Sequence, residues 1–225
     1  KASEHASAAM LEFGKLIEKA GIPPGVVNIV TGHGEPCGRA LTGHPLVARV
    51  SFTGGPNAAR HVLENVKRNF AEVSLELGGK SPFIVFEDAN IESAVNASVA
   101  GIFGATGQSC VAGSRLYLHE DIADEFLARM IALTGRIVIG DPLAEETQMG
   151  PLCTTGQLEH IQREVAHAQE QGGIVLAGGK QPEGMSGLFY EPTIIECPGQ
   201  DLRIVDTELF GPVLCVQRFK SEEDV

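Results

Sequence analysis

A repeating order of short apolar run, glycine-rich turn and helix-spaced segment constrains the fold of this chain more than any other feature. Residues 7–20 carry apolar side chains at helical spacing, and Gly21-Ile22-Pro23-Pro24-Gly25 ends this helix. Strand-like runs follow at Val26 to Val30 and at Val47 to Phe52, the second of which closes on Thr53-Gly54-Gly55. Because strands that alternate with helices pair in parallel, this order predicts the α/β class.

The rest of the chain continues the same alternation. Further helices are expected over 56–69, 91–104, 122–134 and 155–171, and further strands over 73–77, 82–86, 115–119, 174–177, 190–195 and 213–219. Two glycines at Gly78-Gly79 allow a sharp change of chain direction, so we expect one domain over 1–78 and a second over 79–225. The chain opens inside a strand-to-helix connection and Ser221 to Val225 resembles a helix start, so we expect a piece of a longer polypeptide.

Charge and composition exclude several classes of protein. Lys and Arg number 17 against 29 Asp and Glu, a formal net charge of -12, and no basic run offers a footprint for nucleic acid. Apolar stretches are interrupted within about ten residues, whereas a membrane-spanning helix needs roughly 20, and no signal peptide opens the chain. Neither nucleic acid nor a membrane is an expected partner.

The cysteines and histidines fit neither a disulfide scaffold nor a metal site. The 5 cysteines are odd in number, widely spaced and never paired as C-x-x-C, and the 7 histidines lack H-x-x-x-H or H-E-x-x-H spacing. We therefore expect a reducing, cytoplasmic compartment and no metal. Four of the cysteines are expected to be structural: Cys37, Cys153, Cys197 and Cys215.

Four glycine-rich turns are the first functional hint. They contain Gly32-x-Gly34-x-x-x-Gly38, Gly54-Gly55, Gly78-Gly79 and Gly107, and each follows an apolar run. A turn of this kind at the start of a helix presents free backbone N–H groups that can hold a phosphate. Glycines also form tight turns with no ligand, and the first cluster departs from the usual dinucleotide fingerprint in its last interval. The pattern alone leaves both interpretations open.

Two single residues could carry chemistry. Cys110 follows Gly107-Gln108-Ser109 in a small-residue setting, but isolated cysteines are often small buried apolar residues, and a nucleophilic thiolate needs nearby donors, a cation or a base. Glu76 lies in the apolar run Val73 to Leu77, where alternation allows a solvent-facing position. The carboxyl end of a strand is also where open α/β sheets bind ligands, and partial burial there would suit a general base. The residues alone decide neither case.

Three segments together resemble the NAD(P)-dependent aldehyde dehydrogenase superfamily, and they occur in the family's order. They are Leu75-Glu76-Leu77-Gly78-Gly79-Lys80-Ser81-Pro82, Gly107-Gln108-Ser109-Cys110 with Ala112-Gly113-Ser114-Arg115, and Glu208-Leu209-Phe210-Gly211-Pro212. The resemblance implies a general base at Glu76, a catalytic nucleophile at Cys110 and a glutamate for the nicotinamide ribose at Glu208. It also implies a Rossmann-like, parallel-sheet cofactor domain over 1–78 and an α/β catalytic domain over 79–225, each partial.

The resemblance spans nearly the whole chain. Lys1-Ala2-Ser3-Glu4 resembles the family's adenosine-ribose clamp, residues 25–32 its second cofactor-domain strand, and Phe52-Thr53-Gly54-Gly55 its pyrophosphate turn. The chain departs from the family's common residues at Ala2, Gly55 and Ala59. The implied cofactor-binding residues are Lys1, Glu4, Gly34, Gly54, Gly55, Leu77, Glu208 and Phe210. The implied cofactor is NAD, with NADP as the alternative, because a carboxylate at Glu4 suits ribose hydroxyls and repels a 2′-phosphate.

The resemblance also implies a reaction. The Cys110 thiolate attacks an aldehyde to give a thiohemiacetal, hydride passes to NAD(P)+, and water activated by Glu76 hydrolyses the resulting thioester to a carboxylic acid. The family's side-chain oxyanion donor is an asparagine upstream of the Lys1 segment, so we expect the 225 residues alone to be weakly active or inactive. The full-length protein is expected to be a homodimer or homotetramer.

The substrate and two other functions stay open at this point. Phe103, Ser109 and Val111 are the residues expected near the aldehyde, but they do not identify it. A noncatalytic dinucleotide-binding or structural relative is the main alternative, against which the intact Cys110, Glu76 and Glu208 argue. A cysteine hydrolase with a histidine base ranks last, because no histidine adjoins Cys110.

Overall fold

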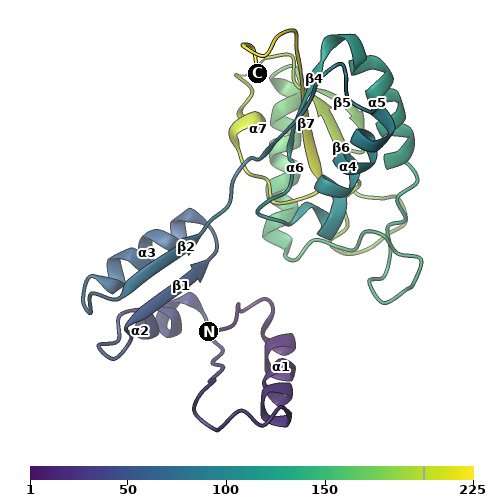
Figure 1. The fold of residues 1–225 in the computed structure, drawn as a ribbon. Coiled ribbons are helices and arrows are strands. Elements are labelled where there is room, and N and C mark those ends of the chain that lie inside the picture. The colour runs from purple at the N-terminus through teal and green to yellow at the C-terminus, as the bar shows by residue number, and fades with distance from the viewer. Residues whose placement is uncertain (200) are drawn as a thin grey trace. The chain divides into compact units, whose positions relative to one another are not determined.

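The chain divides into two compact units, Lys1–Gly78 and Gly79–Val225, so the division lies at the double glycine that the sequence marks. A computed structural model describes residues 1–199 and 201–225 (Figure 1). None of the helices in these ranges is long and apolar enough to cross a membrane. The two units are described separately below.

The first unit is built around a short parallel sheet. Its elements are α1 (Ser7–Lys19), η1 (Gly34–Gly38), α2 (Arg39–Thr42), β1 (Arg49–Thr53), α3 (Pro56–Val66) and β2 (Glu72–Glu76). Strands β1 and β2 pair in parallel, from Arg49 opposite Glu72 to Thr53 opposite Glu76. Helix α3 starts at a proline, which has the backbone angle of a first helical turn and no N–H to leave unpaired. Its buried Val62 and Val66 pack with Val50 of β1.

The strand expected over Val26 to Val30 is not formed. The Val26 N–H donates to the Pro23 carbonyl at 3.2 Å, and the Val30 carbonyl accepts from the Ala2 N–H at 2.9 Å. These isolated bonds are not a ladder, and Val26, Val27 and Val30 are exposed. An apolar run becomes a strand only when a neighbouring strand pairs with its backbone, and within this unit none does.

The second unit contains a five-stranded sheet in the order β3-β4-β7-β6-β5. Its elements are β3 (Pro82–Val85), α4 (Ile91–Phe103), η2 (Gly104–Gly107), β4 (Arg115–His119), α5 (Glu120–Thr134), α6 (Thr155–Glu170), β5 (Ile174–Ala177), β6 (Thr193–Glu196), α7 (Arg203–Asp206) and β7 (Val213–Phe219). Four of these strands are parallel, as the α/β prediction requires. Strand β5 is antiparallel to β6, because residues 178–192 join them without a helix and a parallel connection needs a crossover.

Helices cover both faces of the second sheet (Figure 1). On one face, α4 and α5 pack with Leu116, Leu118 and Val216, and on the other, α6 and α7 pack with Ile195 and Cys215. Two of these helices start at side-chain caps that satisfy an N–H group of the first turn, since Asn90 caps α4 and Thr154 caps α6. At Ser221 to Val225, where a helix start is expected, the chain forms a turn in which Asp224 accepts from the Lys220 and Ser221 N–H groups. A side chain that bonds back to the N–H of a serine three residues earlier is typical of the first turn of a helix.

Candidate active site

A large cleft opens on the first unit beside β1 and α3. Its volume is about 1270 Å³, and it is lined by five of the residues predicted to bind a cofactor: Lys1, Glu4, Gly34, Gly54 and Gly55. Three arginines also line it: Arg39, Arg49 and Arg68. The cleft therefore combines dinucleotide size with cationic side chains that suit a phosphate.

Lys1 and Glu4 form one hydrogen-bonded group at the edge of this cleft. The Lys1 ammonium donates to the Gly32 carbonyl at 2.6 Å and to the Ala2 carbonyl at 2.7 Å, and it lies 3.5 Å from a Glu4 carboxylate oxygen. The Glu4 backbone N–H, followed by the Lys1 ammonium, lowers the pKa of the Glu4 carboxyl below its usual range. Only 17% of the Lys1 side chain is exposed, so this end of the chain is not simply solvated.

The three predicted glycines in the cleft have different reasons to be glycine. A Cβ added at Gly34 or Gly55 would meet nothing within 4 Å, so a ligand can approach the backbone at both positions. A Cβ at Gly54 would lie 2.7 Å from the tip of the Phe52 ring, so a larger residue here would have to displace that ring. The Gly54 N–H also donates to the Glu76 carbonyl at 3.1 Å, which fixes the turn against the end of β2.

Glu76 is the last residue of β2, at the carboxyl end expected for a ligand site. Its side chain and that of Leu77 are both exposed within the first unit. The partial burial that would suit a general base is therefore not present in this unit taken alone. The solvent-facing position that alternation allows is the one observed.

In the second unit, Cys110 follows a left-handed turn. Ala105, Thr106 and Gly107 all have positive φ, at 49°, 58° and 68°. Each non-glycine residue in this conformation is unfavourable by about 1 kcal/mol, so surrounding contacts must hold the turn. The Thr106 hydroxyl donates to the Gly150 carbonyl at 3.2 Å, and the Gln108 side-chain oxygen accepts from the Cys153 N–H at 3.0 Å.

The turn presents an accessible thiol. The Ala112 N–H donates to the Ser109 carbonyl at 3.1 Å, which places Cys110 and Val111 at the tip of a tight turn. Cys110 is exposed, as is Cys153, whereas Cys197 and Cys215 are buried. All 5 cysteines are free. The nucleophile predicted from the sequence is thus accessible, but accessibility alone does not distinguish it from Cys153.

The Cys110 loop meets the Glu208 segment. Gly107 approaches Gly211 so closely that an added Cβ would lie 2.2 Å from the Gly211 carbonyl oxygen. A small cavity of about 10 Å³ lies between the two segments and is lined by Ser109, Glu208 and Phe210, among others. Phe210 has a φ of 50°, and the Gln157 amide donates to the neighbouring Leu209 carbonyl. The fold therefore brings together the predicted nucleophile loop and the predicted ribose-binding segment.

Phe103 does not have the role expected of it. Its side chain is 3% exposed and belongs to the hydrophobic core of the second unit, so it faces no substrate there. It lies in the last turn of α4 on the face that packs against the sheet. Val111, by contrast, is 77% exposed beside Cys110.

Comparison with known proteins identifies the family. A model of the aldehyde dehydrogenase family matches residues 1–225. The chain belongs to the aldehyde dehydrogenase family. It is 53% identical over all 225 residues to (Z)-2-((N-methylformamido)methylene)-5-hydroxybutyrolactone dehydrogenase of Acinetobacter baylyi, and 44% identical to a chloroplastic betaine aldehyde dehydrogenase of Beta vulgaris. It spans 46% and 45% of these two relatives, so it matches about half of each.

Solved aldehyde dehydrogenase-like structures have the same fold. PnpE, solved in complex with nicotinamide adenine dinucleotide, has a TM-score of 0.93 at 47% identity, over 96% of this chain and 45% of that one. Betaine aldehyde dehydrogenase of Staphylococcus aureus, in complex with NAD+, has a TM-score of 0.90 at 36% identity, over 95% and 43%. The α/β expectation and the family resemblance are therefore confirmed.

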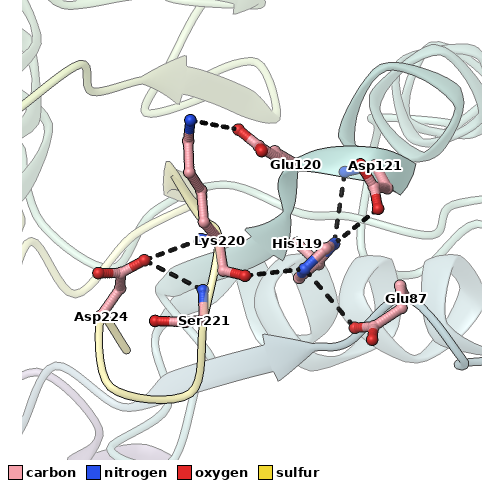
Figure 2. Close-up of polar contacts among 7 residues, drawn as sticks. All are labelled: Glu87, His119, Glu120, Asp121, Lys220, Ser221 and Asp224. Atoms are coloured by element: carbon pink, nitrogen blue, oxygen red, sulfur yellow. Dashed lines mark hydrogen bonds and ion pairs between the residues drawn. The ribbon is translucent and has the colours of Figure 1, made fainter.

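Two of the predicted site residues lie at one edge of the second sheet of this aldehyde dehydrogenase chain. Cys110 precedes β4 and Glu208 precedes β7, at the amino ends of these strands. The carboxyl ends carry a polar cluster around His119, which contacts Glu87, Asp121 and the Lys220 carbonyl (Figure 2). This cluster contains none of the predicted site residues. Across 1–199 and 201–225, no three His, Cys, Asp or Glu side chains gather as a metal site.

Sequence reasoning missed residues whose position depends on the fold. His61, Asn65 and Arg68 line the cleft of the first unit from α3 and its end, and Lys80 lines the small cavity of the second. The only available signal was for Lys80, which lies inside one of the family-like segments. The others occur in an ordinary amphipathic helix, where a polar residue is usually solvated.

Proposed function

We propose that this chain is the nucleophile-bearing part of an NAD(P)-dependent dehydrogenase that oxidises an aldehyde to a carboxylic acid. The observation that carries the proposal is the left-handed turn at Ala105–Gly107, which presents an exposed Cys110 beside the Glu208 segment. Strained backbone is maintained where a functional geometry needs it. The family's named dehydrogenases support the same reaction class.

The cleft of the first unit suits a nicotinamide dinucleotide. The open faces of Gly34 and Gly55 would admit phosphates close to backbone N–H groups, and Lys1 and Glu4 would bind the adenosine ribose hydroxyls. The Glu4 carboxylate favours NAD over NADP. Leu77, Glu208 and Phe210 are assigned to the nicotinamide end. When bound, the oxidised dinucleotide supplies a hydride acceptor.

The chain's own residues would perform the covalent steps. The Cys110 thiolate adds to the aldehyde carbon, and the Cys110 backbone N–H stabilises the oxyanion of the resulting thiohemiacetal. Loss of hydride leaves a thioester on Cys110. Glu76 removes a proton from the water that attacks this thioester, the C–S bond breaks to release the carboxylic acid and the Cys110 thiolate, and Glu76 returns its proton to solvent.

Other features of the whole protein are assigned with the same proposal. Free cysteines are typical of a reducing compartment, and we assign the protein to the cytoplasm as a homodimer or homotetramer. Betaine aldehyde and aminoaldehydes are the substrates to test first, because several relatives are named for them.

Thiol trapping tests the nucleophile. The 225-residue chain is treated briefly with iodoacetamide near pH 7, with and without NAD, and each cysteine's modification rate is measured by mass spectrometry. Cys153 is the internal control, because it is exposed like Cys110 and its N–H donates to Gln108 in the loop that carries Cys110. We expect Cys110 to react about ten times faster than Cys153, as an activated thiolate does, and NAD to change only the Cys110 rate.

A second measurement tests the division of roles. With NAD and betaine aldehyde present, we expect an acyl adduct on Cys110 that accumulates in Glu76→Gln, because the base that activates water is missing. Cys110→Ser should abolish the adduct, and Cys153→Ala should leave it unchanged. Equal reactivity of Cys110 and Cys153, with no effect of NAD and no adduct, would favour a noncatalytic relative if the full-length protein gave the same result.

A further inference from the structure

Lys80 carries a charge to which the proposed reaction gives no role. Its Nζ atom is buried, and within residues 1–199 and 201–225 it has no hydrogen-bond partner. A buried ammonium without a partner is strongly unfavourable, and buried polar groups in folded proteins nearly always have one. The surroundings of Lys80 should therefore supply a hydrogen-bond partner for its ammonium group.

The backbone of Lys80 is fixed at the reactive edge of the second sheet. Its carbonyl accepts from the Arg115 Nε at 2.7 Å, and it lies two residues before β3. Lys80 lines the cavity of about 10 Å³ together with Glu208, Ser109 and Ser114. That volume holds about one water molecule, and a polar site of this size suits a bound water.

Two groups beside Lys80 could receive its charge. Glu208 lines the same cavity, although no Glu208 oxygen lies within the 4.0 Å that defines an ion pair. Cys215 is the other, since the Cys197 thiol first, and then the Lys80 ammonium, lower the pKa of Cys215 to about 7. The Cys215 thiol donates to the Ile204 carbonyl at 3.5 Å. A thiol sulfur is a weak hydrogen-bond acceptor and a carboxylate is a strong one, so Glu208 is the better acceptor.

We propose that this cavity binds one water, which accepts a hydrogen bond from the Lys80 ammonium and donates one to the Glu208 carboxylate. Lys80 is then a positioning residue for Glu208. The link fixes the carboxylate that the proposed function assigns to the nicotinamide ribose, and it rests on that function only for the role of Glu208. Gly107 and Gly211, which approach each other closely, both line this cavity.

A double-variant cycle on the 225-residue chain tests the link. Lys80→Met and Glu208→Gln are made singly and together, and the urea midpoint is followed by tyrosine fluorescence. This signal reports on residues 79–225 alone, because the chain has 2 tyrosines, Tyr117 and Tyr190, and no Trp. We expect the shift of the urea midpoint in the double variant to be at most about half of the sum of the shifts in the two single variants. Additive shifts overturn the proposal.

Two further variants separate the candidate partners. Coupling of Lys80→Met to Cys215→Ala and not to Glu208→Gln would make the thiolate the partner and overturn the proposal. Lys220→Met is the matched control, because its ammonium is exposed on the same unit, and it should leave the midpoint unchanged. If Lys80→Met does not fold, Lys80→Gln takes its place in the same cycle.

The effect of NAD on Cys110 alkylation separates this proposal from the proposed function. We expect the NAD concentration that gives half of the maximal change in the Cys110 alkylation rate to rise about tenfold in Lys80→Met and by the same factor in Glu208→Gln. The double variant should show no further rise. A coupled cycle keeps the water link even if NAD has no effect on the unsubstituted chain, and the same lack of effect in the full-length protein refutes the proposed function. An NAD effect that Glu208→Gln weakens and Lys80→Met leaves unchanged overturns the positioning role and keeps the function.

Discussion

Gly107→Ala should strongly destabilise the second unit. An added Cβ would lie 2.2 Å from the Gly211 carbonyl oxygen, 2.3 Å from its carbon and 2.7 Å from the Pro212 nitrogen. All three are backbone atoms, so no side-chain rotation relieves the overlap. The φ of 68° adds about 1 kcal/mol of left-handed strain, and overpacking typically adds 1–3 kcal/mol, so we expect about 2–4 kcal/mol in total.

The control for this experiment separates strain from overlap. Gly184 also has a positive φ, at 76°, but a Cβ there would meet nothing within 4 Å, so Gly184→Ala should lose only about 1 kcal/mol. The unfolding of both variants by urea is followed by tyrosine fluorescence, and a common m-value converts the urea midpoints into free energies of unfolding. If Gly107→Ala lowers the free energy of unfolding no more than Gly184→Ala does, the Cys110 and Glu208 segments are not closely packed.

Two further predictions concern buried polar groups in the same unit. The Tyr190 hydroxyl is buried without a hydrogen-bond partner, so Tyr190→Phe should raise the free energy of unfolding by about 1 kcal/mol at pH 8, measured by circular dichroism in urea. Burial raises the pKa of Tyr190, so the unfolded state loses the hydroxyl proton at a lower pH than the folded state does. The free energy of unfolding should therefore fall as the pH rises above about 10, and it should fall less in Tyr190→Phe, which has no such proton. Arg203→Met should lose about 1–2 kcal/mol, because it leaves the Glu164 carboxylate, 6% exposed and 2.9 Å from Arg203, without its main cation; an unchanged urea midpoint would contradict this.

Much of the secondary structure follows from local pattern. Strand β4 occupies the residues expected for it, Arg115–His119. Apolar residues that alternate with polar ones between two turn signals are typical of a strand. Helix α5 begins two residues earlier than its apolar pattern, since His119 accepts from the Asp121 N–H and caps the helix. Capping depends on a side-chain rotamer, which periodicity does not contain.

The errors came from properties that involve partners distant in sequence. Val26 to Val30 has the composition of a strand, but pairing decides whether such a run forms one. Phe103 is near Cys110 in sequence, yet the helix turns its ring into the core. Lys80 shows the same limit, because nothing in a sequence reveals that the end of a lysine is buried.

The site residues divide in a similar way. Cys110, Glu208 and Phe210 were singled out by resemblance, and the fold places their segments around one cavity. Glu76 was singled out in the same manner, but its exposure within the first unit could not be read from alternation alone.

The two edge strands of the second sheet affect how the protein behaves at high concentration. Strand β3 has only four residues and begins with Pro82, which has no N–H to donate to another chain. Strand β5, at the other edge, also has four residues and an irregular register between Val175 and Ala177. Short, interrupted edges offer few backbone groups for strand addition by a second molecule. This sheet should therefore resist the edge-to-edge aggregation to which longer, regular edge strands are prone.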